Sequence, residues 1–281
     1  MSGYKLGKWN LDELIKNPTR NNIDKKLADI EKNVKQFEKV KKSLNPKISP
    51  TKFMRILHDI ESISEKSSKV GGYASLRYSE NTQSDEATAL LSKISKFGAN
   101  IENRMLFFDL WWKKKIDEKN AKRLMKSTGN LTDYLRFKRL LSKYSLSEPE
   151  ERIINTLDVT GSNALVKLYD KITNAYVYVV TISGKKKTMN REQLTTLVRS
   201  SNSKTREMAY KVLFSKYNEN KGVTGEIYQN IVQNWRDEGI GMRGFSSPIT
   251  IRNISNDIDD KTVSTLLDVC KKNTGIFQKY F

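Results

Sequence analysis

The chain contains 281 residues, of which 37% are hydrophobic and 30% are charged, and its formal net charge is +19. This length allows a large core and two packed units. No apolar run approaches a membrane span, and residues 1–10 lack the apolar segment of a signal peptide. The only cysteine, Cys270, excludes an internal disulfide framework and favours a reducing compartment, so we expect a cytoplasmic protein.

The first part of the chain predicts two long amphipathic helices. Trp9 to Leu14 forms a short apolar anchor, after which apolar residues recur at helical spacing from Leu27 to Leu44. Asn45-Pro46 ends the first helix, and Ser49-Pro50 provides the cap and the first residue of the second. We expect Gly71-Gly72 to interrupt the second helix, because glycine destabilises helix interiors.

A third helix, the longest, is predicted to begin after Ser84. Its apolar stripe continues from Ala87 to Trp112, and apolar residues on other faces near its end indicate burial on more than one side. Another helical run spans residues 118–144, with an interruption near Gly129.

A change from helical to strand periodicity distinguishes the middle of the chain. Ser147 and Glu150 form a capping box, and we expect Gly161 to end that helix in a left-handed conformation. A second helical run follows. The apolar residues then alternate with a period of two, which predicts a hairpin that turns at Gly184. The residues expected on its packed face are Tyr176, Tyr178, Val180 and Ile182.

Helices are predicted again from residue 190 onward. Asn190 with Gln193 caps the first of them, and Ser203 caps the second, which we expect Gly222 to break. A glycine-containing loop, residues 239–248, follows these helices.

The last predicted helix is capped by Asp259 or Asp260 and continues to Phe281. No glycine, asparagine or proline terminates it, and its final turn is aromatic, with Phe277, Tyr280 and Phe281. Chain ends are ordinarily polar and frayed, so we expect these side chains to pack against a partner surface outside this sequence.

These patterns predict a mainly α-helical protein, a multi-helix bundle of long antiparallel helices with one small β-hairpin at about residues 176–189. The high positive charge also allows nucleic-acid binding. However, most lysines alternate with acidic residues, and the densest clusters, Lys113–Lys115 and Lys185–Lys187, hold three lysines each. We interpret them as solvated surface, and Tyr176 and Tyr178 as cross-strand packing rather than base stacking.

No residue pattern indicates a catalytic, cofactor-binding or metal site. His58 is the only histidine, and a zinc site needs three or four histidine, cysteine or carboxylate ligands. We therefore interpret His58 as a partly buried structural residue and Cys270 as a small core residue. Pairs of carboxylates such as Glu150 with Glu151 stand at helix starts, where capping explains them.

Gly239-x-Gly241-x-x-Gly244 matches the dinucleotide-binding string but lacks its context. The fingerprint needs a strand before the glycines and a helix that begins within them, whereas here a helix precedes and Ser-Ser-Pro follows. We interpret the string as a plain loop.

Many short segments of the chain match, in order, the pattern of one enzyme family, and the matches are most specific from Leu146 to Phe281. The matching segments are Trp9–Leu14, Tyr73–Leu76, Asn81-Thr82 with Asp85, Leu146–Glu151, Gly161–Tyr169, the hairpin, Arg206–Tyr210, Ile227–Ile231, Ser247-Pro248, Arg252-Asn253 and Asn256-Asp257. Through them the chain resembles the N-terminal portion of oligoendopeptidase F-type zinc metallopeptidases, relatives of thimet oligopeptidase.

This resemblance implies three regions and a missing catalytic motif. The regions are an N-terminal helical region (1–115), an oligopeptidase F N-terminal-type domain with the hairpin (116–189), and the opening helices of a truncated peptidase domain (190–281). In the family, two histidines of a His-Glu-x-x-His helix and a downstream glutamate hold zinc, which activates water for attack on peptide bonds. This sequence contains no such motif and is expected to stop before it. The resemblance therefore transfers no catalytic, metal or cofactor residue to any position, and zinc is implied only for the full-length relatives.

Two functions follow as expectations, and whether the chain alone is an enzyme stays open. In the first, the chain forms part of a channel wall that admits oligopeptides, is inactive alone, and has the zinc-bearing half as its partner. A truncated reading frame would give the same sequence. In the second, it is a helical scaffold or nucleic-acid-binding protein that uses its basic surface.

Overall fold

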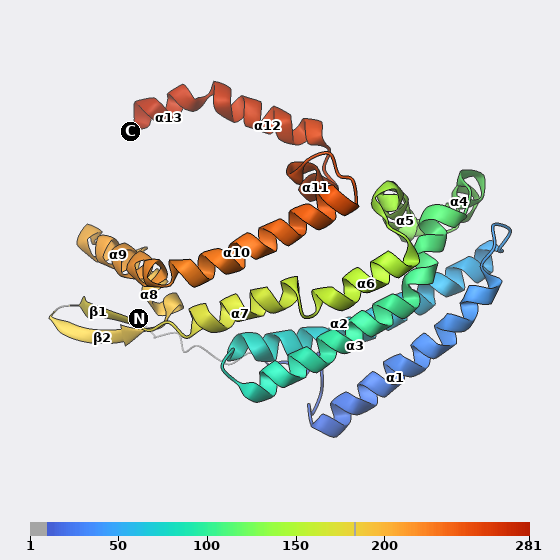
Figure 1. Cartoon of the computed structure of the whole chain (residues 1–281), viewed down its shortest axis with the longest axis horizontal. Coiled ribbons are helices and arrows are strands. Elements are labelled where there is room, and N and C mark those ends of the chain that lie inside the picture. The colour runs from blue at the N-terminus through green and yellow to red at the C-terminus, as the bar shows by residue number, and fades with distance from the viewer. Residues whose placement is uncertain (1–9, 183) are drawn as a thin grey trace.

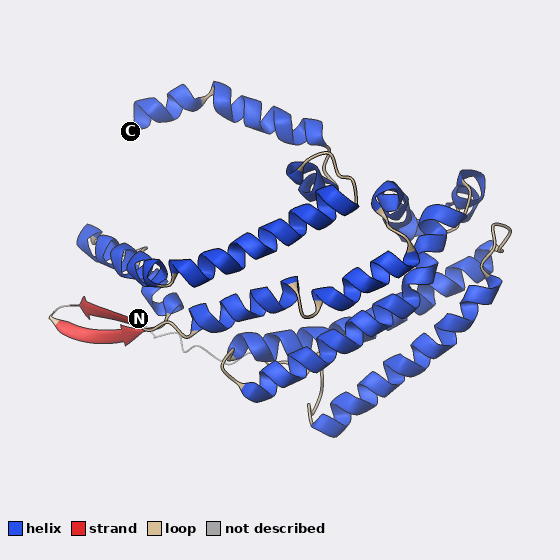
Figure 2. Ribbon diagram, viewed as in Figure 1, coloured by secondary structure: helices blue, strands red, loops and turns tan. Residues whose placement is uncertain are grey.

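The computed structural model describes residues 10–182 and 184–281, which are mainly helical with one antiparallel hairpin (Figures 1 and 2). The predicted fold class is confirmed. No helix among the described residues is both long and apolar enough to cross a membrane. The predicted anchor begins at Trp9, which lies outside the described residues. Its residues Leu11 and Leu14 pack against the larger hydrophobic core, which is described next.

Three long helices, α1 (Arg20–Glu38), α2 (Pro50–Glu80) and α3 (Asp85–Leu110), build the larger of two hydrophobic cores (Figure 1). Each begins with a side chain that accepts a hydrogen bond from a first-turn amide, and these caps are Thr19, Ser49 and Ser84. The apolar stripes predicted from the sequence are the faces that meet in this core.

Aromatic residues fill the end of this core. Phe53 stacks on Trp112, and the ring centroids lie 5.1 Å apart. The Trp112 indole Nε1 donates a hydrogen bond of 2.9 Å to the Leu135 carbonyl oxygen, which attaches a group of short helices to the bundle. The short segments here are η1 (Lys39–Ser43), the π-helical η2 (Trp111–Lys115), α4 (Glu118–Met125), η3 (Gly129–Leu131), α5 (Thr132–Leu140) and η4 (Leu141–Tyr144).

Two helices, α6 (Glu148–Asp158) and α7 (Ser162–Asn174), then run along the bundle to the smaller core (Figure 1). The predicted capping box at Ser147 is confirmed. The Asn103 amide donates a 3.1 Å hydrogen bond to the Thr156 hydroxyl, which joins α3 to α6.

The smaller core forms around the hairpin of β1 (Tyr178–Ile182) and β2 (Lys185–Met189). Its predicted alternation is confirmed, since Tyr176, Tyr178 and Val180 are buried. Tyr178 is only 1% exposed, and burial raises its pKa to about 12. Two helices cover the hairpin: α8 (Arg191–Leu197), capped by Asn190, and α9 (Ser203–Glu219).

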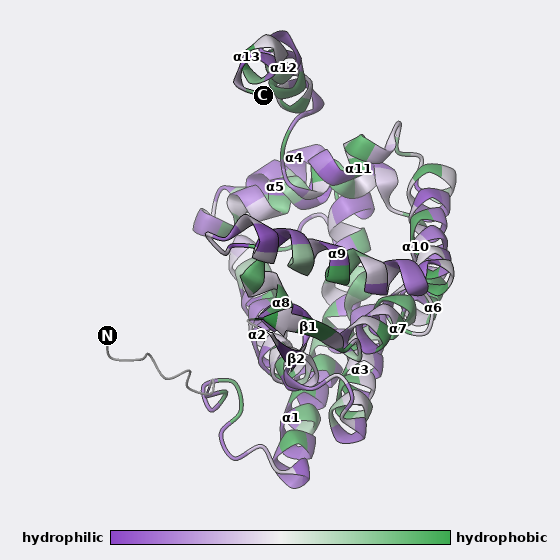
Figure 3. Cartoon of the chain, turned by 90° about the vertical axis from the view of Figure 1, so that its left-hand side faces the viewer, coloured by the Kyte–Doolittle hydropathy of each residue, from purple (hydrophilic) through white to green (hydrophobic). Residues whose placement is uncertain are grey.

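The remaining helices of the described chain contribute no residue to either core. The α10 helix (Lys221–Arg236) runs beside α7 and continues into the π-helical η5 (Asp237–Met242), which is followed by α11 (Pro248–Ser255). The last two, α12 (Asp260–Lys272) and α13 (Thr274–Tyr280), extend from α11 as an arm that stands away from the rest of the chain (Figure 3).

Several predicted helix ends are wrong. Gly71 and Gly72 lie inside α2, where burial of the neighbouring Val70 and Tyr73 offsets the low helix propensity of glycine. The break expected at Gly222 falls at Asn220, and the last helix is interrupted at Asn273.

Gly161 does not take the expected left-handed conformation, since its φ is −93°. Glycine serves a different purpose there, because a Cβ at this position would lie only 3.0 Å from the Leu157 carbonyl oxygen. The predicted division at residues 115 and 189 stays a prediction.

Candidate functional site

The single histidine and the single cysteine of the chain lie on different helices and form no common site. His58 is exposed on α2, where its Nδ1 lies 3.0 Å from a Glu61 carboxylate oxygen, and Cys270 is exposed on α12. Both burial predictions are therefore wrong: His58 lies on the solvent face of α2, and α12 has no covering layer. Within residues 10–182 and 184–281, no group of three or more His, Cys, Asp or Glu side chains is placed to hold a metal ion.

The two lysine clusters have different surroundings. The Lys113 ammonium lies 2.5 Å from a carboxylate oxygen of Asp109, and Lys138 lies 2.7 Å from the other oxygen. Burial opposes the charged form of Asp109, but the two ammonium groups outweigh it and lower its pKa. This cluster is thus partly neutralised, whereas Lys185–Lys187 on β2 is exposed.

The prediction of a plain loop at residues 239–244 is wrong, because the glycine string begins inside the π-helical η5. A Cβ at Gly239 would clash with the Ile251 Cδ1, so glycine permits close packing of η5 on α11. Gly244 has a φ of +71° and supplies the turn that follows. The glycines therefore have a packing and turning role, and the helix α10, not a strand, leads directly into them.

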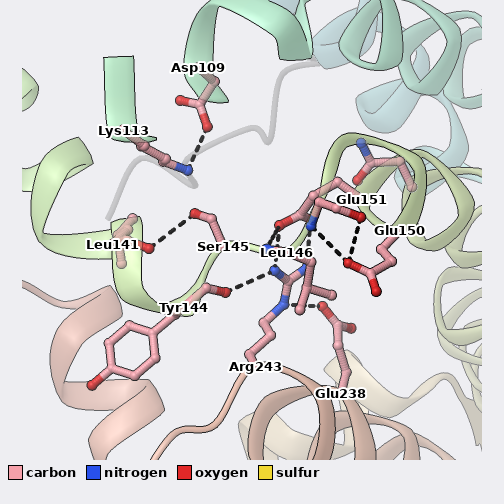
Figure 4. A network of polar contacts seen from close by, with 12 residues as sticks. Asp109, Lys113, Leu141, Tyr144, Ser145, Leu146, Glu150, Glu151, Glu238 and Arg243 are labelled. Atoms are coloured by element: carbon pink, nitrogen blue, oxygen red, sulfur yellow. Dashed lines mark hydrogen bonds and ion pairs between the residues drawn. The ribbon is translucent and has the colours of Figure 1, made fainter. Parts of the chain in front are cut away.

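Arg243, which follows η5, anchors a polar network that joins the two halves of the chain (Figure 4). Its guanidinium binds both carboxylate oxygens of Glu151 at 2.8 and 2.9 Å, and its Nε donates to Glu238 at 2.7 Å. It also donates to the Tyr144 carbonyl oxygen at 3.3 Å. Bidentate pairing of this kind fixes both the distance and the orientation of the two elements.

In this network one arginine serves two carboxylates, Glu151 and Glu238. Burial opposes ionisation of Glu151, but hydrogen bonds from Arg243 and from the Leu146 amide outweigh it, so the pKa of Glu151 is lowered. The hydrogen bond with Glu151 in turn raises the pKa of Arg243. Beside the network, the rings of Tyr144 and Phe245 stack with centroids 3.7 Å apart.

Sequence reasoning missed this joint. From the sequence, Glu151 is explained by helix capping, and Arg243 lies inside the glycine string that is interpreted as a plain loop. The partners are 92 residues apart, and the only local signal was the position of a carboxylate in the first turn of α6.

Many large apolar side chains of α9, α10, α12 and α13 are exposed, and we call this set of residues the apolar interface. Its exposed side chains are Tyr210, Phe214, Val223, Tyr228, Val232, Leu266, Leu267, Val269, Ile276, Phe277, Tyr280 and Phe281. Large apolar side chains exposed in such number on neighbouring segments of the sequence indicate an interaction site. The helical spacing of Val263, Leu266, Leu267 and Cys270 predicted a packed α12 face, but Leu266, Leu267 and Cys270 are exposed and Val263 is half-buried.

Comparison with known proteins identifies relatives in sequence and in structure. No protein-family model matches the chain. Among curated proteins, the oligoendopeptidase F homolog of Borreliella burgdorferi is 22% identical over 286 aligned positions, which cover 98% of this chain and 45% of that protein.

Two solved structures share the fold. Oligoendopeptidase-F from Enterococcus faecium has a TM-score of 0.77 at 18% identity, and the match covers 93% of this chain and 52% of that one. A “putative peptidase” from Chlamydophila abortus has a TM-score of 0.58 at 16% identity, with coverage of 97% and 46%. The chain spans about half the length of the relatives it matches. The predicted resemblance is thus confirmed: over nearly its whole length, this chain is similar to about half of an oligoendopeptidase F protein.

Proposed function

We propose that this chain is the helical N-terminal part of an oligoendopeptidase F-like zinc peptidase and acts on oligopeptides only together with a zinc-bearing part. The apolar interface carries the proposal. A chain that spans about half of its relatives and exposes many large apolar side chains on α9–α13 needs a covering partner.

The residues present do not fit a zinc site of the family's kind. The chain has one histidine, and the family's site needs two on one helix with a glutamate between them. His58 and Cys270 are both exposed and belong to helices of different parts of the fold. We therefore derive no catalytic step from this chain and attribute to it the binding and shaping of a channel wall. The exposed thiol suits the reducing cytoplasm in which we place the protein.

The test is association with the polypeptide encoded directly downstream of Phe281, produced separately. We expect a 1:1 complex by sedimentation, which replacement of exposed interface residues, Leu266→Ser with Phe277→Ser, weakens. The matched control is Leu140→Ser with Val177→Ser, two similarly exposed apolar residues outside the interface. No complex, or equal weakening by both pairs, contradicts the proposal.

A nucleic-acid-binding scaffold is the alternative, and the exposed Lys185–Lys187 cluster is the observation that favours it. This alternative predicts retardation of DNA or RNA at low salt that disappears steeply as salt increases. Lack of retardation at low salt removes it.

A further inference from the structure

A groove between α6 and the end of α10 differs in charge from the rest of this basic chain. Its volume is about 430 Å³, within the usual range of ligand sites. Its lining comprises Leu146, Glu150, Ile153, Ile154, Leu157, Asp158, Asn234, Asp237, Glu238 and Met242. Four of these ten residues are acidic and none is basic, in a chain of net charge +19. We call this feature the acidic groove.

Within the described chain, three of the four groove carboxylates form no ion pair, and two of these three accept no hydrogen bond either. Glu238 pairs with Arg243, and Glu150 accepts hydrogen bonds from the Ser147 amide and hydroxyl. By contrast, no lysine or arginine of the described chain forms an ion pair with Asp158 or Asp237. Burial and the negative charge of Glu238 raise the pKa of Asp158, against a smaller opposing effect of Arg243. The groove thus holds negative charge that an added cation would compensate.

Apolar side chains border the same carboxylates. Leu157 is 62% exposed and Met242 is 60% exposed, although both line the groove. Covering a large exposed apolar side chain with a ligand contributes favourable free energy, because apolar surface is removed from water. Methionine is flexible and adapts to ligands of different shape. A matching ligand therefore carries apolar groups and positive charges close together.

We propose that the acidic groove binds a cationic peptide segment in which apolar side chains alternate with lysine or arginine. The ammonium or guanidinium groups pair with Asp158 and Asp237, and the apolar side chains cover Leu157 and Met242. The negative charge of the groove disfavours nucleic acid and anionic lipid. A bare metal ion lacks the apolar part, and no described group of three carboxylates converges on one point. Binding needs only this chain and does not depend on the proposed peptidase function.

The test is fluorescence anisotropy with the full chain and a fluorescein-labelled Lys-Leu-Lys-Leu-Lys amide. We expect saturable binding that Asp158→Asn with Asp237→Asn weakens by at least about fivefold, since each variant removes one exposed ion pair. The Leu157→Ser variant should weaken the same peptide by about threefold or more, because it removes covered apolar surface. It should leave a Lys-Ser-Lys-Ser-Lys amide unaffected. Leu157 is largely exposed, so this variant retains the fold even if the charge variant does not.

The matched control is Glu226→Gln with Asp268→Asn, which removes two exposed carboxylates from α10 and α12, outside the groove. We expect this control to bind the leucine peptide as tightly as the unchanged chain. The proposal is overturned if the unchanged chain does not bind the peptide, if the control and the groove variant lose affinity equally, or if Leu157→Ser has no effect.

Discussion

The joint between Glu151 and Arg243 allows a sharp prediction about stability. The Glu151 side chain is 12% exposed and that of Arg243 is 19% exposed, so solvent screens the pair much less than it screens surface pairs. Glu151→Gln removes the charge but keeps the shape, and we expect the free energy of unfolding to fall by about 2 kcal/mol at neutral pH. Arg243→Met leaves both Glu151 and Glu238 without their cation and should cost about 3 kcal/mol.

The pH dependence identifies the origin of this loss. The pKa of Glu151 in the folded chain is below its ordinary value of 4.5, so its contribution is complete above that value and disappears as pH falls through the folded-state pKa. Urea unfolding followed by circular dichroism should therefore show the unchanged chain and Glu151→Gln converging at acid pH. Glu148→Gln removes the same charge from the start of α6, where the half-buried carboxylate pairs with the exposed Lys41 and Arg152 only at 3.8 Å, and it should have little effect. Equal midpoints for Glu151→Gln and the unchanged chain at pH 7 would refute the reasoning.

Three further changes test other parts of the fold by urea unfolding. Asp109→Asn leaves Lys113 and Lys138 facing each other and should cost about 2 kcal/mol at pH 7; no loss would show that the cluster is solvated. Gly239→Ala should cost about 1–2 kcal/mol and Ile251→Val should recover part of it, because the new methyl group meets the Ile251 Cδ1; absence of rescue contradicts that contact. Tyr178→Phe removes a buried hydroxyl that has no partner among the described atoms, so stability should change by less than about 1 kcal/mol; a larger loss would reveal a bound water.

Local signals in the sequence were sufficient for most of the fold. Ser49, Ser84, Ser147 and Asn190 each cap a helix because their side chains accept a bond from an amide a few residues away. The hairpin alternation was equally local, since burial of one strand face follows directly from period two. Elements set by neighbouring residues could thus be predicted without the structure.

The sequence predictions that are wrong concern features that depend on tertiary contacts. Gly71 and Gly72 suggested a break, but the packing of α2 in the larger core offsets their cost. The π-helical η5 and the position of Arg243 depend on contacts with α6 and α11 that no local pattern contains. The apolar face of α12 predicted burial, and this prediction is wrong: no described segment covers that face, and Cys270 is exposed for that reason.

The most direct test of the proposed function is cleavage of a quenched fluorescent oligopeptide by three samples: this chain, the polypeptide encoded downstream of Phe281, and their mixture. We predict cleavage by the mixture alone, loss of it on addition of a zinc chelator, and recovery when zinc is restored. Chelator-sensitive cleavage by this chain alone, or no cleavage by a mixture that forms the complex, would contradict the account.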